Sequence, residues 1–311
     1  MKTVWKIMKI ILLIVILICL GLGAFYLYSD NAPIIKSDFA QNVQTGGDLE
    51  NRYLQWGDSD TSRMRIKVDS PAKKLTIFYP SQLENEDRTW PMILYVNGTG
   101  GKASRYEPLL EQMASWGFIV VGTQDKATGN GESTIQTLKD MISENENPKS
   151  IFYKKIDLEN IGITGFSQGG AGLFNAITAF KESPYFKTAV AVSPASESTA
   201  AKLGYPYDIS QVNCPVFLLS GTSGEFEQEF VIPFDQMLEM YNRMNVPKVM
   251  ARRTGMTHDV MTSNAQGYVI AWMKWQLQND REAARVFTGS SPELLSNDRY
   301  KDVKIDLDGM K

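Results

Sequence analysis

One ten-residue run combines a strand, a tight turn and the start of a helix, and it limits the fold more than any other part of the chain. The run is Ile161-Gly162-Ile163-Thr164-Gly165-Phe166-Ser167-Gln168-Gly169-Gly170. Its β-branched residues predict a buried strand, and glycines stand two positions before and after Ser167, where strand and helix nearly collide. The next residues, Ala171–Phe180, predict a helix whose amino end favours a developing negative charge. Ser167 is therefore a candidate nucleophile.

Strand and helix signals alternate along most of the remaining chain. This alternation predicts an α/β fold with a mainly parallel sheet that is covered by helices on both faces. We expect strands at Arg63–Val68, Leu75–Tyr79, Met92–Val96, Phe118–Val121, Thr188–Val192, Val216–Ser220 and Val249–Arg253. We expect further helices at Tyr106–Trp116, Thr134–Glu144, Ile232–Met244 and Asp259–Gln278.

The bulk composition is that of a globular domain and argues against several classes of function. Of 311 residues, 43% are hydrophobic, and the net charge of −3 provides no basic surface for nucleic acid. Two cysteines, Cys19 and Cys214, and a single histidine cannot assemble a Cys/His metal cluster. We expect neither a metal nor a cofactor, and the sequence does not define an oligomeric state.

The amino terminus departs from this composition. Lys2, Lys6 and Lys9 precede an uncharged run, Ile10–Tyr28, which as a helix would span about 28 Å, close to the hydrocarbon thickness of a bilayer. The alternative, a cleaved signal peptide, is disfavoured because the run is longer than a typical apolar region of such a peptide and no Ala-x-Ala-like site follows it. We expect a cytoplasmic basic segment at 1–9, a single-pass transmembrane anchor at 10–28, a tether and approach to the folded domain at 29–60, and a catalytic domain at 61–311 outside the cytoplasm.

His258 is the only histidine and lies between the last predicted strand and the last predicted helix. A serine nucleophile needs a base that exchanges protons near neutral pH, and imidazole is the usual one. His258 is therefore the predicted base for Ser167. The acid should follow the preceding strand, because the partners occur in the order serine, acid, histidine. Glu225 is the first carboxylate there and is our prediction, while Glu227 and Glu229 are alternatives. A third interpretation is that these acidic residues only form the solvated start of a helix.

A developing oxyanion needs two backbone N–H groups aimed at one point. The amide of Gln168, directly after the candidate nucleophile, is the first. The second is expected from the loop Asn97-Gly98-Thr99-Gly100-Gly101 after the strand Met92–Val96, and Thr99 is our choice. This loop lacks the glycine spacing and the Gly-Lys-Ser/Thr ending of nucleotide-binding loops, which disfavours phosphate binding.

Three segments together resemble α/β-hydrolases of the cutinase-like, polyester-hydrolase and chlorophyllase-like group. They are Pro91–Gly101, Trp116–Val121 and Gly165–Gly170, and the resemblance extends from about residue 70 to the end of the chain. It implies a serine carboxylesterase without a cofactor, in which Ser167 attacks, His258 is the base, and Thr99 and Gln168 are oxyanion donors. The chain departs from the group in having no aspartate near Gly224 and no disulfide near its C-terminus. The short segment Ala195–Ser210 implies that no large cap domain is present.

These patterns predict a membrane-anchored serine esterase that acts on a small-molecule or polymeric ester through a Ser-His-acid triad. Two alternatives remain open at the level of sequence. One is an acyltransferase or a peptidase on the same scaffold. The other is a non-catalytic binding protein that keeps the fold. The irregular position of the acid keeps this interpretation open, whereas an intact Ser167 and the sole histidine, His258, argue against it.

Overall fold

The computed structural model describes residues 5, 16, 18, 19, 22, 28–70 and 72–309. The chain divides into two units, residues 1–34 and residues 35–311. Most of the expected basic segment at 1–9 and of the expected anchor at 10–28 lies outside the described residues. Among the residues that are described, no helix is long and apolar enough to cross a membrane.

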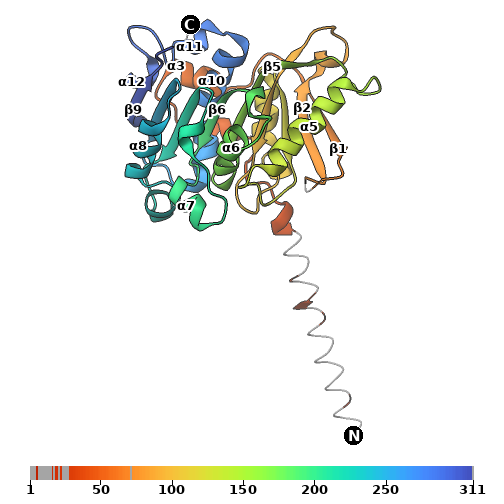
Figure 1. Cartoon of the computed structure of the whole chain (residues 1–311), viewed down its shortest axis with the longest axis horizontal. Coiled ribbons are helices and arrows are strands. Elements are labelled where there is room, and N and C mark those ends of the chain that lie inside the picture. The colour runs from red at the N-terminus through yellow and green to blue at the C-terminus, as the bar shows by residue number, and fades with distance from the viewer. Residues whose placement is uncertain are drawn as a thin grey trace. The chain divides into compact units, whose positions relative to one another are not determined.

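A nine-stranded sheet forms the centre of the second unit, as far as the structure describes it, in the order β1-β2-β4-β3-β5-β6-β7-β8-β9 (Figure 1). From β4 to β8 in this order all neighbours are parallel, whereas β1, β2 and β9 pair antiparallel at the two edges. The expected α/β fold with a mainly parallel sheet is therefore confirmed. The strands are β1 Thr61–Lys67, β2 Lys74–Pro80, β3 Trp90–Val96, β4 Ile119–Thr123, β5 Ile156–Phe166, β6 Phe186–Val192, β7 Val216–Gly221, β8 Lys248–Arg253 and β9 Tyr300–Asp306.

Helices cover both faces of the sheet because the central strands are apolar on both sides. In β3, Ile93 and Tyr95 face one hydrophobic cluster, while Met92, Leu94 and Val96 face the other. This pattern is typical of parallel strands buried between two helical layers. One layer contains α3 Asp48–Leu54, α4 Glu107–Ser115 and α10 Gln266–Gln278, and the other contains α5 Glu132–Glu146, α6 Gln168–Thr178 and α8 Phe234–Arg243.

Several short elements were not predicted from the sequence. The expected helix at Asp259–Gln278 is broken into a 3₁₀ turn at His258–Val260, a short helix α9 and the long helix α10. The edge strand β9 escaped prediction because its side chains are mostly exposed or half-buried. The other short helices are α2 Phe39–Asn42, α7 Glu197–Lys202, α9 Met261–Asn264, α11 Arg281–Ala284 and α12 Glu293–Ser296.

The segment at 29–60, expected as a tether and approach to the folded domain, belongs to the second unit from residue 35 onward. Tyr53 and Leu54 are fully buried in the core. Gly46 marks a close approach to a distant part of the chain, because a Cβ atom there would lie 2.1 Å from the side-chain oxygen of Asn297. The apolar residues are too few and too irregularly spaced to give a helical period. Their burial is decided by tertiary contacts with distant parts of the chain.

A buried ion pair fastens this N-terminal segment to the sheet. Glu50 of α3 is 1% exposed and pairs with Arg253 of β8, which is 2% exposed. The same carboxylate accepts hydrogen bonds from Asn297, at 2.8 Å, and from the Tyr300 hydroxyl, at 3.2 Å. Three segments that are far apart in the sequence, around residues 50, 253 and 297–300, therefore meet at one carboxylate.

Replacing Glu50 with alanine is expected to lower the free energy of unfolding by about 3–5 kcal/mol, because Arg253 would be left buried without its counter-ion. Chemical denaturation monitored by tryptophan fluorescence measures this change. Glu282→Ala is the matched control, since it breaks an exposed pair with Arg52 and should cost about 1 kcal/mol at most. Equal losses of unfolding free energy in the two variants would contradict a stabilising role for the buried pair of Glu50 with Arg253.

Candidate active site

The candidate nucleophile lies at the junction of β5 and α6, in a conformation that few side chains adopt. Ser167 has φ 59° and ψ −125° and directly precedes the first residue of α6. Its N–H donates to the Val192 carbonyl at 3.2 Å, and its own carbonyl accepts from the amides of Ala195 and Gly170 at 3.1 and 2.9 Å. These bonds hold a strained backbone in place, which is characteristic of functional turns.

Two glycines make this turn possible, as the sequence pattern predicts. A Cβ atom at Gly165 would lie 2.4 Å from the Gly169 carbonyl oxygen, and one at Gly169 would lie 2.1 Å from the Val96 carbonyl oxygen. Both separations are shorter than real Cβ contacts allow. The end of β5, the start of α6 and the end of β3 can approach this closely only without side chains, and the approach presents Ser167 at the carboxyl edge of the sheet.

The structure brings Ser167, His258 and a glutamate into one hydrogen-bonded chain. The Nε2 atom of His258 lies 2.9 Å from Oγ of Ser167. The Nδ1 atom lies 2.6 Å from Oε2 of Glu227. His258 begins the 3₁₀ turn after β8, its imidazole stacks on the Phe166 ring with centroids 4.6 Å apart, and its side chain is 13% exposed. These three side chains thus have the mutual geometry of a catalytic triad.

The carboxylate beside His258 is Glu227, which corrects the prediction of Glu225. Residues 226–231 form a π-helix after β7, and residues two apart on a helix point to different sides. Glu227 faces inward and is 1% exposed, whereas Glu225 and Glu229 are exposed.

The second oxygen of Glu227, Oε1, accepts from the Gly221 amide at 2.7 Å and from the Ser193 hydroxyl at 2.5 Å. Both oxygens of the Glu227 carboxylate therefore have hydrogen-bond partners.

The segment between β6 and β7 supports this π-helix. The Ser196 amide donates to the Val231 carbonyl at 2.8 Å, and the Thr199 hydroxyl donates to the Phe230 carbonyl at 2.5 Å. Among the described residues the segment contains only α7 and a 3₁₀ turn, so no large cap lies here. Its contacts hold the last turn of the π-helix, and thereby the backbone that presents Glu227.

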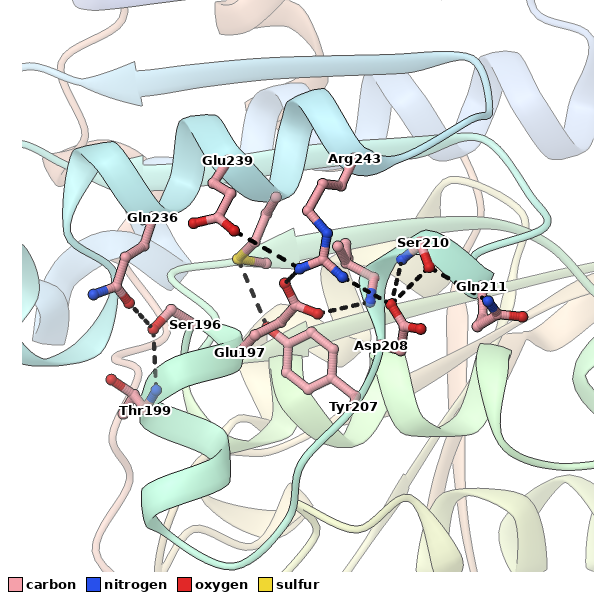
Figure 2. A network of polar contacts seen from close by, with 12 residues as sticks. Ser196, Glu197, Thr199, Tyr207, Asp208, Ser210, Gln211, Gln236, Glu239 and Arg243 are labelled. Carbon is pink, nitrogen blue, oxygen red and sulfur yellow. Dashed lines mark hydrogen bonds and ion pairs between the residues drawn. The ribbon is translucent and has the colours of Figure 1, made fainter.

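A polar network connects the same segment to α8. Figure 2 shows the Arg243 guanidinium between Glu197 and Asp208, with nitrogen-oxygen distances of 2.5 and 3.0 Å. The Ser196 hydroxyl donates to the Gln236 side chain at 2.5 Å. Because α8 directly follows the π-helix, these bonds hold the segment between β6 and β7 against the helix that comes after Glu227.

The predicted oxyanion residues lie on either side of the candidate nucleophile. Gln168 is the first residue of α6, so its amide has no intrahelical acceptor. The loop that contains Thr99 comes close to Ser167, because a Cβ atom on Gly98 would lie 3.2 Å from the Ser167 Cβ. The side-chain oxygen of Gln168 accepts a hydrogen bond from the Thr128 amide at 3.1 Å.

The described residues contain no group of three or more histidine, cysteine or acidic side chains that could hold a metal ion. Cys214 is a free, buried thiol, and burial raises its pKa to about 12. A thiol with so high a pKa remains protonated and is a poor nucleophile.

A mainly parallel sheet with a serine at a strand-turn-helix junction, followed by acid and histidine after later strands, defines an α/β-hydrolase. Residues 40–303 match the family model described as PETase, PET hydrolase-like, and the chain belongs to this family of ester-hydrolysing α/β-hydrolases. No curated protein matches the chain at a significant level.

Proposed function

We propose that this chain is a serine hydrolase that cleaves carboxylic esters through an acyl-enzyme. The observation that carries the proposal is the continuous chain of hydrogen bonds from Ser167 through His258 to Glu227. Glu227 accepts the Nδ1–H of the imidazole, which leaves Nε2 free to accept the serine proton. The inverse tautomer would leave the base without a lone pair toward Ser167.

The reaction follows from this arrangement. Oγ of Ser167 forms a bond to the acyl carbon while His258 takes its proton, and the carbonyl oxygen becomes an oxyanion held by the amides of Thr99 and Gln168. When the tetrahedral intermediate collapses, the bond to the alcohol oxygen breaks and the imidazolium protonates the leaving alkoxide. Water, deprotonated by His258, then attacks the acyl-enzyme, and the carboxylic acid leaves as Ser167 recovers its proton.

Hydrolysis of nitrophenyl esters of increasing acyl length by the purified full chain tests this proposal. We expect turnover that depends on Ser167, with free acid as the product. An acyltransferase would pass most of the acyl group to an added alcohol and form a new ester. We expect no such diversion. Absence of both products would favour the binding-protein alternative.

Two exposed aromatic side chains support an apolar substrate. Phe226 and Phe230 are 56% and 44% exposed and stack with centroids 5.5 Å apart on the π-helix. The Phe226 ring also meets the His258 imidazole edge-on at 5.1 Å. Exposed aromatic groups beside a candidate nucleophile provide contact area for an apolar part of an ester.

Replacing Phe230 with alanine is therefore expected to raise KM for long-chain or aromatic esters about three- to tenfold, because one of the two stacked rings is lost. KM for an acetate ester and kcat for all esters should change less than about twofold, since Phe230 is not in contact with His258. Steady-state kinetics on both ester types measures the difference. A uniform loss of kcat would show that the ring supports the π-helix rather than the substrate.

We also propose that residues 10–28 anchor the enzyme in the cell membrane, with the hydrolase domain outside the cytoplasm. The support is the uncharged run after three lysines. The full chain is expected to stay with membranes after an alkaline carbonate wash, and protease added to intact cells should digest the hydrolase domain. Release of the chain by the wash, or its recovery without the first residues, would contradict an uncleaved anchor.

A further inference from the structure

We infer that Ser193 is a positioning residue of this active site, a fourth member of the hydrogen-bonded chain that holds Glu227 in place for His258. The inference rests on the proposed function. Ser193 directly follows β6, is fully buried, and its hydroxyl lies 2.5 Å from Oε1 of Glu227. The Gly221 amide binds the same oxygen at 2.7 Å. Two donors on Oε1 leave Oε2 to the imidazole.

The backbone of Ser193 is strained, which points to a use for its side chain. Its φ is 43°, in the left-handed region that glycine or asparagine adopts more easily. A strained residue persists only where the surrounding structure fixes it, and here the Ser193 amide donates to the Leu219 carbonyl at 2.7 Å. Glycine would satisfy the backbone without strain, but it would supply no hydroxyl to the carboxylate.

The residues around Ser193 connect both ends of the triad. Val192 accepts from the Ser167 amide, and the Ala195 amide donates to the Ser167 carbonyl. Between these two contacts, Ser193 reaches the acid. One short segment after β6 therefore sets the position of the nucleophile backbone and the orientation of the Glu227 carboxylate. Without the hydroxyl, a buried charged oxygen would lose one of its two donors, and the carboxylate plane could rotate away from the imidazole.

The first test observes the hydrogen bond itself and needs no turnover. Because His258 is the only histidine, protein labelled with ¹⁵N-histidine gives the Nδ1–H resonance of this residue alone. We expect this resonance to shift in Ser193→Ala and Ser193→Gly. It should keep its position in Ser220→Ala, which removes a buried hydroxyl at the neighbouring end of β7 that does not bind Glu227. An unchanged resonance in both Ser193 variants would overturn the inference, whether or not the protein hydrolyses esters.

The second test is kinetic and separates positioning from general stability. Ser193→Ala and Ser193→Gly are each expected to lower kcat about tenfold, with KM changed less than about twofold. The glycine variant relieves the backbone strain, so a loss of kcat there cannot come from poor folding. In the Glu227→Gln background, Ser193→Ala should lower kcat by no more than about twofold further, because the hydroxyl acts through the carboxylate.

A full tenfold additional loss in the Glu227→Gln background would contradict the positioning role, as would a Ser193→Gly variant with the kcat of the parent. Failure of the proposed function gives a different result. In that case the parent shows no turnover, while the His258 resonance still shifts in the Ser193 variants.

Discussion

Alanine at Ser167 is expected to lower kcat for ester hydrolysis by about 10⁵–10⁶-fold, and alanine at His258 to lower it by a similar factor. The two losses should be alike because the residues act as a unit: without the imidazole 2.9 Å away, the hydroxyl is not activated, and without the hydroxyl the base has nothing to activate. The double variant should therefore be no slower than either single variant. Steady-state hydrolysis of a nitrophenyl ester measures all three.

Ser290→Ala provides the control for this experiment, because Ser290 is exposed in the loop before α12 and far along the chain from the site. It should retain the kcat of the parent. All variants should unfold at nearly the same temperature as the parent, since the two triad side chains are partly accessible and fill no core cavity. Activity in the Ser167→Ala variant above about one part in a thousand would mean that another group performs the attack.

The second large effect is expected at the acid. Glu227→Gln should lower kcat by about 10³–10⁴-fold, because the amide keeps the shape of the side chain but no longer stabilises the imidazolium or selects the productive tautomer. Glu225→Gln and Glu229→Gln remove neighbouring exposed charges and should change kcat less than about twofold. Parallel kinetics on the three variants measures the contrast. A larger loss in Glu225→Gln would restore the acid that the sequence indicated.

That Ser167 and His258 lie together could be predicted because the position of each depends on local constraints. Gly165 and Gly169 are required by the close approach of three backbone segments, and this requirement is visible as a spacing in the sequence. His258 was identifiable because it is the only imidazole and follows the last parallel strand. Much of the strand and helix pattern could be predicted for a similar reason, since β3, β4 and β7 are buried along almost their whole length and are mostly apolar.

The acid could not be predicted because the π-helix is a tertiary feature. Counting from the end of β7 favours Glu225, the first carboxylate, but the helical rotation between residues 225 and 227 turns Glu227 inward and Glu225 outward. The contact of Ser193 with Glu227 could not be predicted either, since Ser193 follows β6, Glu227 lies in the π-helix after β7, and the two share no spacing signal. The role of Glu50 in joining α3 to β8 was missed for the same reason.

The intact mass of the full chain after treatment with a fluorophosphonate shows whether Ser167 is the nucleophile of this site. We predict a single adduct that replaces the Ser167 hydroxyl proton and maps to the peptide containing Ser167. It should be absent in Ser167→Ala and form much more slowly in His258→Ala. Labelling at another serine, or no labelling of a parent chain that is folded, would contradict the assignment of this site as a serine hydrolase.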